Sequence, residues 1–239
     1  IYLGQRMMKK IIGFCGLLLW SFSVSAGIKF NPIQLYIQDS TRQRSTTVSV
    51  ESTGLKKSRI FEISAVKWKQ NQQGEDILEE DKTLLFNPKT FELKPESKQI
   101  VRVGFSQPLA NINQEQTWRI IFKEVTPIED DSSINFLFNF SLPLFAGKQV
   151  NPKLNLKLEK LDNQAYLNID NVAKSHIKII EILVTDNKNK EILKKKLGQY
   201  VLGGNRIKLE LGEITNNNEL KIKIKTDKDE KYLEYSVKG

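Results

Sequence analysis

The side chains that could do chemistry in this chain are few and scattered. His176 is the single histidine, so a histidine-based catalytic triad would depend on this residue alone. It stands in NVAKSHIKII, at a turn before an apolar segment, where we interpret it as capping a loop or a sheet edge. Glu79, Glu80 and Asp81 are consecutive acids, a pattern typical of a solvated charge run in a loop.

Metal and phosphate sites are not predicted either. Cys15 is the single cysteine, and no Cys/His spacing typical of a zinc site occurs. Gly203 and Gly204, in LGGN, fit a hairpin turn better than a phosphate-binding loop. We therefore expect no catalytic residue, no metal site and no cofactor, and we expect that the chain is not an enzyme.

Residues 132–145, SSINFLFNFSLPLF, carry a more informative pattern. Along a strand, successive side chains point to opposite faces. One face would hold an apolar stripe consisting of Ile134, Phe136, Phe138 and Phe140. Such a segment aggregates when it is exposed. Either it fills the core of its own domain, or it lies at a sheet edge as a template for pairing with another chain.

The N-terminal residues predict export. Lys9 and Lys10 precede the apolar run IIGFCGLLLWSFSV, and VSA ends at Ala26. A basic region, an apolar region and small residues two apart form a secretory signal peptide. We predict that residues 1–26 are a signal peptide with upstream residues, that cleavage follows Ala26, and that the protein resides in a bacterial periplasm.

Composition limits the remaining possibilities. Charged residues make up 27% of the 239 and hydrophobic ones 39%, which is typical of a globular chain. Loss of Arg6, Lys9 and Lys10 would lower the net charge from +9 by three, to +6. This modest basicity favours acidic or carboxylate-bearing partners and argues against nucleic acid. No apolar run after residue 26 approaches the ~18 residues of a membrane span, so we expect no stable membrane insertion.

Short alternating segments separated by turns predict an all-β fold. In the first half, TTVSVEST, RIFEISAVKW, QIVRVGF and TWRIIFKEV alternate with period two; in the second, KLNLKLEKL, IKIIEILVTD and LKIKIKT do so. KEILKKKLG could be a helix, but we interpret it as a strand. We predict two tandem Ig-like β-sandwiches in an L-shaped arrangement, residues 27–147 and 148–239.

The ordered set of segments resembles the periplasmic pilus-assembly chaperones of the chaperone–usher pathway, in the PapD-like superfamily. The resemblance covers nearly the whole chain after residue 26, and it is closest to the archaic, Csu-type branch. The matching segments are IKFNPIQLYI, TTVSVESTG, FEISAVKW, LLFNPKTFELKPESKQIVRVGF, TWRIIFKEVTP, INFLFNFSLPLF, LNIDNVAKSHIKI and YVLGGNRIKLEL.

This resemblance implies a function for the apolar stripe. In the family, the last strand of the first domain is lent to a pilus subunit whose own fold lacks a strand, and the subunit is then passed to an outer-membrane usher. The implied partners are therefore pilus or fimbrial subunits and the usher. The implied donor residues are Ile134, Phe136, Phe138 and Phe140, with Leu142 as an extension.

The resemblance also implies basic residues that hold the C-terminal carboxylate of the subunit. Arg119 is the first candidate and Lys123, on the same face of its strand, is the second. Gln34 and Pro143 stand where the classical branch has an arginine and a lysine. Arg102 matches a family position that we interpret as structural.

Two other functions remain as alternatives. A pilus or surface subunit would have one incomplete domain and an N-terminal donor arm. An exported enzyme or carbohydrate-binding sandwich would need a carboxylate pair or an aromatic platform, whereas Trp68 and Trp118 stand at positions that the strand pattern assigns to the core.

Overall fold

A computed structural model of the chain describes residues 27–39, 42–109, 113–127, 136–161, 164–214 and 220–237. Every regular element in these ranges is a β-strand, which confirms the all-β prediction. Across the same ranges, no helix of the length and apolar character needed to cross a membrane occurs. The predicted signal peptide and Ile134 lie outside the described residues.

The N-terminal sandwich consists of two sheets with a common core. One sheet has four strands, in the order β1-β3-β8-β6, and the other has six, in the order β2-β10-β9-β4-β5 with β7 also paired to β4. The strands are β1 (Gly27–Asn31), β2 (Leu35–Ile37), β3 (Ser45–Thr53), β4 (Arg59–Gln70), β5 (Asp76–Glu80), β6 (Leu84–Asn87), β7 (Thr90–Leu93), β8 (Lys98–Phe105), β9 (Gln116–Glu124) and β10 (Asn139–Ala146).

Alternating side chains form the core between these sheets. Val48 of β3 lies opposite Val101 of β8, and Ile63 of β4 lies opposite Phe122 of β9. All four are buried and belong to one apolar cluster. The period-two segments of the sequence therefore form the expected half-buried strands.

The C-terminal sandwich repeats the principle with seven strands. A three-stranded sheet, β11-β12-β15, packs against a four-stranded sheet, β14-β13-β16-β17. The strands are β11 (Leu154–Leu161), β12 (Gln164–Asn171), β13 (Ile177–Thr185), β14 (Glu191–Val201), β15 (Arg206–Glu213), β16 (Leu220–Thr226) and β17 (Asp229–Val237). All of KEILKKKLG except Lys190 lies in β14, so its interpretation as a strand is confirmed.

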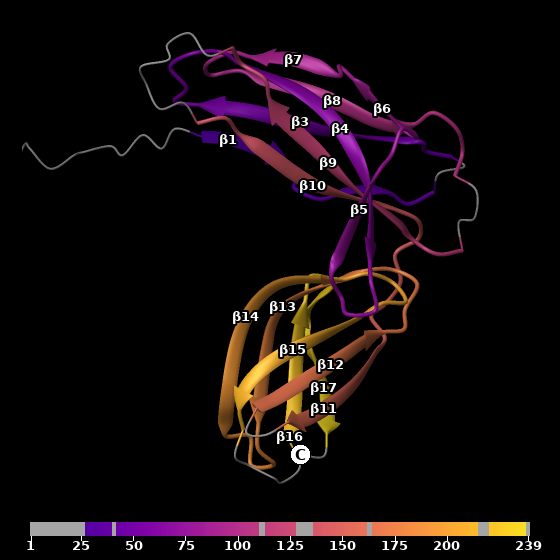
Figure 1. The fold of residues 1–239 in the computed structure, drawn as a ribbon, viewed down its shortest axis with the longest axis vertical. Coiled ribbons are helices and arrows are strands. Elements are labelled where there is room, and N and C mark those ends of the chain that lie inside the picture. The colour runs from indigo at the N-terminus through magenta and orange to yellow at the C-terminus, as the bar shows by residue number, and fades with distance from the viewer. Residues whose placement is uncertain are drawn as a thin grey trace, which may run out of the picture.

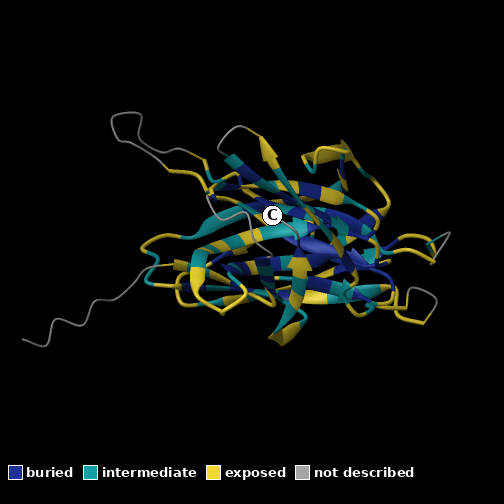
Figure 2. Ribbon diagram, turned by 90° about the horizontal axis from the view of Figure 1, so that it is seen from below, coloured by how far each residue is buried: buried dark blue, intermediate teal, exposed yellow. Residues whose placement is uncertain are grey.

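The two sandwiches are set at an angle to each other (Figure 1). Buried residues fill the middle of each layer, and exposed ones concentrate at turns and rims (Figure 2). Two separate apolar clusters, one per sandwich, confirm the tandem arrangement. The division after residue 147 stays a prediction; β10 ends at Ala146 and β11 begins at Leu154.

One local prediction was wrong. Glu79 and Glu80 are not in a loop but in β5, which pairs with β4 at the edge of the six-stranded sheet. Both side chains are exposed, and Glu79 forms an ion pair with Lys69 at 2.7 Å. Alternation could not indicate this strand because both of its faces are exposed to solvent.

Candidate functional site: an exposed apolar stripe on an open sheet edge

The apolar stripe begins inside the N-terminal sandwich and ends outside it. Leu142 is only 7% exposed, and Phe140 is half-buried. Phe138 is 38% exposed and Phe136 76%. Exposure thus increases steadily from β10 into the residues that precede it. Ile134, the remaining predicted donor, is not among the described residues.

The neighbours of the stripe explain this gradient. Phe140 lies opposite Phe122 of β9, and its ring centroid is 4.8 Å from that of Phe30. Phe138 stacks on Phe140 with ring centroids 5.6 Å apart. The core of the domain therefore ends at Phe140, and Phe138 stacks on the outer side of this last ring.

The N-terminal half of β10, from Asn139 to Pro143, has an open edge. β2 pairs only with the last three residues of β10, and no described strand pairs with Asn139, Ser141 or Pro143 on that side. The N–H of Glu124 donates to the carbonyl of Phe138 at 2.8 Å. Because bonded pairs alternate along an antiparallel ladder, Asn139 and Ser141 direct their backbone groups toward the open edge. Pro143, which has no N–H, is tolerated at such an edge.

A buried ion pair lies where the stripe leaves the core. Nη1 of Arg59 is 2.8 Å from Oε1 of Glu124, whose side chain is 0% exposed. Neither residue was predicted from the sequence to be functional. A signal was present, because Glu124 continues the core-facing series of Trp118, Ile120 and Phe122 with a charge.

The domain interface is a small aromatic and apolar cluster. Trp68 and Phe145 of the first sandwich pack with Leu202 of the second, and all three are buried. Tyr36 of the first sandwich and Tyr200 of the second also pack against this cluster. Trp68 is thus buried as predicted, but it lies between the domains rather than inside one.

Arg119 lies on this interface. Its guanidinium carbon is 3.8 Å from the ring centroid of Trp68 and 5.6 Å from that of Tyr200. Its side chain is 20% exposed, and Nη2 is 3.9 Å from the carboxylate of Asp76. Burial lowers the pKa of Arg119, opposed by the charge of Asp76. A partly desolvated guanidinium of this kind attracts an incoming anion more strongly than a solvated one.

Lys123 and Arg119 do not form a single basic site. It is exposed and lies between Glu62 of β4 and Asn139 of β10. Four residues along a strand separate the two basic side chains, a backbone distance of about 13 Å. The structure therefore places them on the same face of β9 but brings only Arg119 to the domain interface.

Gln34 connects the domains beside Arg119. Its Nε2 donates to the hydroxyl of Tyr200 at 2.7 Å, and its Oε1 accepts from the hydroxyl of Tyr36 at 3.2 Å. Gln34 also borders a hollow of about 410 Å³. The lining of this hollow consists of Pro32, Ile33, Gln34, Tyr36 and Thr46.

His176 lies in the loop directly before β13, as the sequence predicted, but its contact with the other domain was not predicted. His176 is fully buried at the domain interface, with its ring stacked on Phe145 at 3.4 Å. The ammonium of Lys228 lies 3.2 Å from Nε2 and can only donate, so Nδ1 carries the proton and donates to Glu115 at 2.8 Å. Burial lowers the pKa of Lys228, opposed by Asp227 and Glu115. His176 thus joins the sandwiches.

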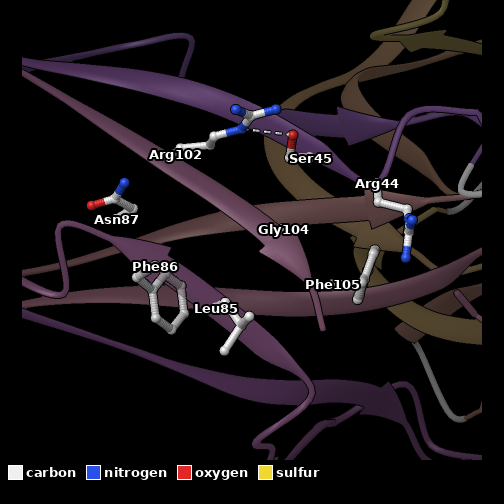
Figure 3. A pocket seen from close by; sticks show the side chains of 8 residues that line it. All are labelled: Arg44, Ser45, Leu85, Phe86, Asn87, Arg102, Gly104 and Phe105. Carbon is white, nitrogen blue, oxygen red and sulfur yellow. Dashed lines mark hydrogen bonds between the residues drawn. The ribbon is translucent and has the colours of Figure 1, made fainter. Parts of the chain in front are cut away.

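A second hollow, of about 490 Å³, lies on the four-stranded sheet of the N-terminal sandwich (Figure 3). Arg102 is directed toward Ser45 there, and its Nε donates to the hydroxyl at 2.9 Å. A Cβ at Gly104 would lie 2.9 Å from the carbonyl oxygen of Arg44, so glycine permits this close approach. The lining consists of Arg44, Ser45, Leu85, Phe86, Asn87, Arg102, Gly104 and Phe105. This hollow and the apolar stripe are on different sheets and are separate surfaces.

Known structures with the same arrangement of strands exist. A chain of the CsuC–CsuE chaperone–tip adhesion subunit pre-assembly complex, from archaic Csu pili of Acinetobacter baumannii, matches with a TM-score of 0.65 at 19% identity. The match covers 89% of this chain and 98% of the other. The fold is that of the pilus chaperones. It confirms the predicted resemblance at the level of architecture.

Further chaperones share this fold. The YadV chaperone matches with a TM-score of 0.63 at 12% identity, over 89% of this chain and 99% of its own. The Escherichia coli chaperone DraB matches with a TM-score of 0.58 at 12% identity, over 90% and 99%. No protein-family model matches the chain, and no curated protein matches it in sequence. The likeness therefore rests on the fold.

Proposed function

We propose that this protein is a periplasmic chaperone that binds pilus subunits by donor-strand complementation and delivers them to an outer-membrane usher. One observation carries the proposal: an apolar stripe, 38% exposed at Phe138 and 76% at Phe136, continues from an open sheet edge. A strand of this kind exposes both backbone groups and large side chains to a partner. It therefore fits a chain that completes the sheet of another protein.

The donor strand would act through both kinds of group. Asn139 and Ser141 would extend the sheet of the subunit through their backbone hydrogen bonds. Phe136 and Phe138 would fill the open core of the subunit. Each buried aromatic side chain contributes about 1.5–3 kcal/mol, from which the entropic cost of association must be subtracted. Ile134 and Phe140 complete the proposed donor set.

The carboxylate of the subunit's C-terminus would bind at Arg119, with Lys123 as the second candidate. A guanidinium suits a carboxylate because it offers two parallel donors and stays charged. The support is the position of Arg119, which is stacked on Trp68 at 3.8 Å. A fixed charge there would set the register in which the subunit strand enters.

The compartment and the remaining partners follow from the same proposal. The signal peptide would be cleaved after Ala26, and N-terminal sequencing of protein recovered from the periplasm tests this. The function requires no catalysis, no cofactor, no nucleic acid and no membrane insertion. Trp68 and Trp118 are each 1% exposed, so they do not provide the aromatic platform that a carbohydrate-binding module would need.

Co-expression with a candidate pilin from a neighbouring gene tests the proposal. The full chain should carry the pilin through purification from periplasm, and a Phe136→Ser, Phe138→Ser variant should remain folded but lose it. Leu85→Ser with Ile100→Ser is the matched control, because these side chains are 60% and 57% exposed on the other sheet. Retention of the pilin by the phenylalanine variant would overturn the donor-strand assignment.

A further inference from the structure

β9 and β10 separate at one pair of residues. The N–H of Glu124 donates to the carbonyl of Phe138 at 2.8 Å, as the ladder requires. Beyond this pair the chain that follows β9 stays beside β4, because Val125 donates to the carbonyl of Ile60 at 2.8 Å and Ile60 donates to the hydroxyl of Thr126 at 2.9 Å. Residues 136–138, which directly precede Asn139, belong to no strand. The sheet thus forks at Glu124 and Phe138.

The carboxylate of Glu124 replaces a ladder partner at this fork. The N–H of Phe138 donates to Oε2 of the side chain at 2.9 Å. In an uninterrupted antiparallel ladder that N–H would donate to the opposing backbone carbonyl. The side-chain acceptor satisfies the donor without requiring the chain to continue along β9.

Arg59 holds the other side of the fork. Its Nη1 donates to Oε1 of Glu124 at 2.8 Å and to the carbonyl of Phe136 at 3.3 Å. Its guanidinium carbon lies 5.3 Å from the ring centroid of Phe138. One cation therefore contacts the buried acid, the backbone of Phe136 and a face of the Phe138 ring.

Packing of the sandwich core does not explain why residue 124 carries a charge. Glu124 follows Trp118, Ile120 and Phe122 on the core-facing side of β9, and its side chain is 0% exposed. Burial raises the pKa of Glu124, but hydrogen bonds from Arg59, Phe138 and Thr126 outweigh it and the net pKa is lowered. A residue that breaks the local pattern and is fully satisfied by neighbouring groups points to a role beyond packing.

We propose that Arg59 and Glu124 are positioning residues for segment 136–138. They end the ladder at Phe138 and fix the backbone of Phe136, so that both rings project from the core in one register. This inference rests on the proposed function, because it assigns a purpose to segment 136–138 as the donor. A segment held in its binding conformation loses less conformational freedom on association than a free one.

The double substitution Arg59→Met, Glu124→Leu is the decisive variant. Leucine restores the apolar pattern of β9, and replacing both members of a buried ion pair by apolar groups is often neutral for stability. Arg59→Lys is the second variant, since a point-like ammonium does not bridge the carboxylate and the carbonyl of Phe136 as a planar guanidinium does. Glu51→Leu is the control, because it removes an exposed 2.8 Å ion pair with Lys98 on the other sheet.

Two measurements separate positioning from simple stabilisation. Hydrogen exchange of the Phe138 amide in the free protein should accelerate at least about tenfold in Arg59→Met, Glu124→Leu, with an unchanged urea midpoint. In competition with wild type for limiting co-expressed pilin, the variant should capture about ten- to a hundredfold less. Arg59→Lys should lose capture while the Phe138 amide stays protected, and Glu51→Leu should change neither quantity.

The outcomes distinguish this inference from the proposed function. Unchanged exchange, or unchanged capture with accelerated exchange, would overturn the positioning role. If capture falls only as far as the urea midpoint does, in both variants, the pair is merely structural and the inference fails. If the Phe136→Ser, Phe138→Ser protein captures pilin normally, the donor assignment itself is wrong, whatever the exchange data show.

Discussion

Alanine substitutions along the apolar stripe should separate folding from binding. Phe136 is 76% exposed, so Phe136→Ala removes little from the folded domain, under about 1 kcal/mol. The exposed three-quarters of the ring is available to a partner and contributes about 2 kcal/mol to binding, about a 30-fold change in affinity. Leu142 is 7% exposed, so Leu142→Ala should lower the free energy of unfolding by about 2–5 kcal/mol.

Phe138 is the intermediate case. At 38% exposure it shares its surface between the core and a partner, so Phe138→Ala should lower both quantities by about 1–2 kcal/mol. The two effects should therefore run in opposite directions along the apolar stripe, with the binding effect largest at Phe136 and the folding effect largest at Leu142.

Two assays resolve these effects. Urea denaturation followed by circular dichroism gives the free energy of unfolding of each variant. Relative affinity comes from co-expressing wild type and variant with different tags and a limiting amount of pilin, then measuring the ratio of the two complexes. Equal losses of stability at Phe136 and Leu142, or a larger loss of capture at Leu142 than at Phe136, would refute the shared-strand argument.

Three further predictions concern the domain interface and its surroundings. Arg119→Ala should lower pilin capture about 10- to 100-fold with the sandwich still folded, since charged hydrogen bonds contribute about 1.5–3 kcal/mol; unaltered capture would place the carboxylate site elsewhere. Glu115→Ala should lower the free energy of unfolding by about 3 kcal/mol, because it leaves the buried N–H of His176 without its 2.8 Å acceptor, and urea denaturation measures this. Burial lowers the pKa of Lys67 to about 8, against about 10.4 for an unfolded lysine, so the unfolded chain holds more protons between pH 8 and 10. Stability should therefore rise across that range in wild type relative to Lys67→Met; parallel urea midpoints at pH 7.5 and 9.5 would contradict this.

The sequence was sufficient for what depends on neighbours along the chain. Period two placed Val48 and Val101 in strands because their faces alternate in burial. It also identified the apolar stripe, although alternation alone could not tell how much of it the domain covers. That extent depends on Phe30, which comes from the far end of the chain to pack on Phe140.

The sequence was insufficient where distant segments meet. His176 and Glu115 are 61 positions apart, and nothing near either predicts their contact across two domains. Trp68 fits a core strand equally well whether its cover is its own domain or the next one. Glu124 is different, because its charge in an apolar series was visible in the sequence and required only the question of which groups would satisfy it.

The burial of Trp68 has a spectroscopic consequence. The sequence contains three tryptophans, and Trp20 belongs to the predicted signal peptide. Of the other two, Trp118 lies in the core of the first sandwich and Trp68 lies against Leu202 of the second. No tryptophan follows residue 118. Intrinsic tryptophan emission therefore reports the first sandwich and the interface between the two, but not the interior of the second. Separation of the domains should then shift the emission of Trp68 toward the red while that of Trp118 stays unchanged.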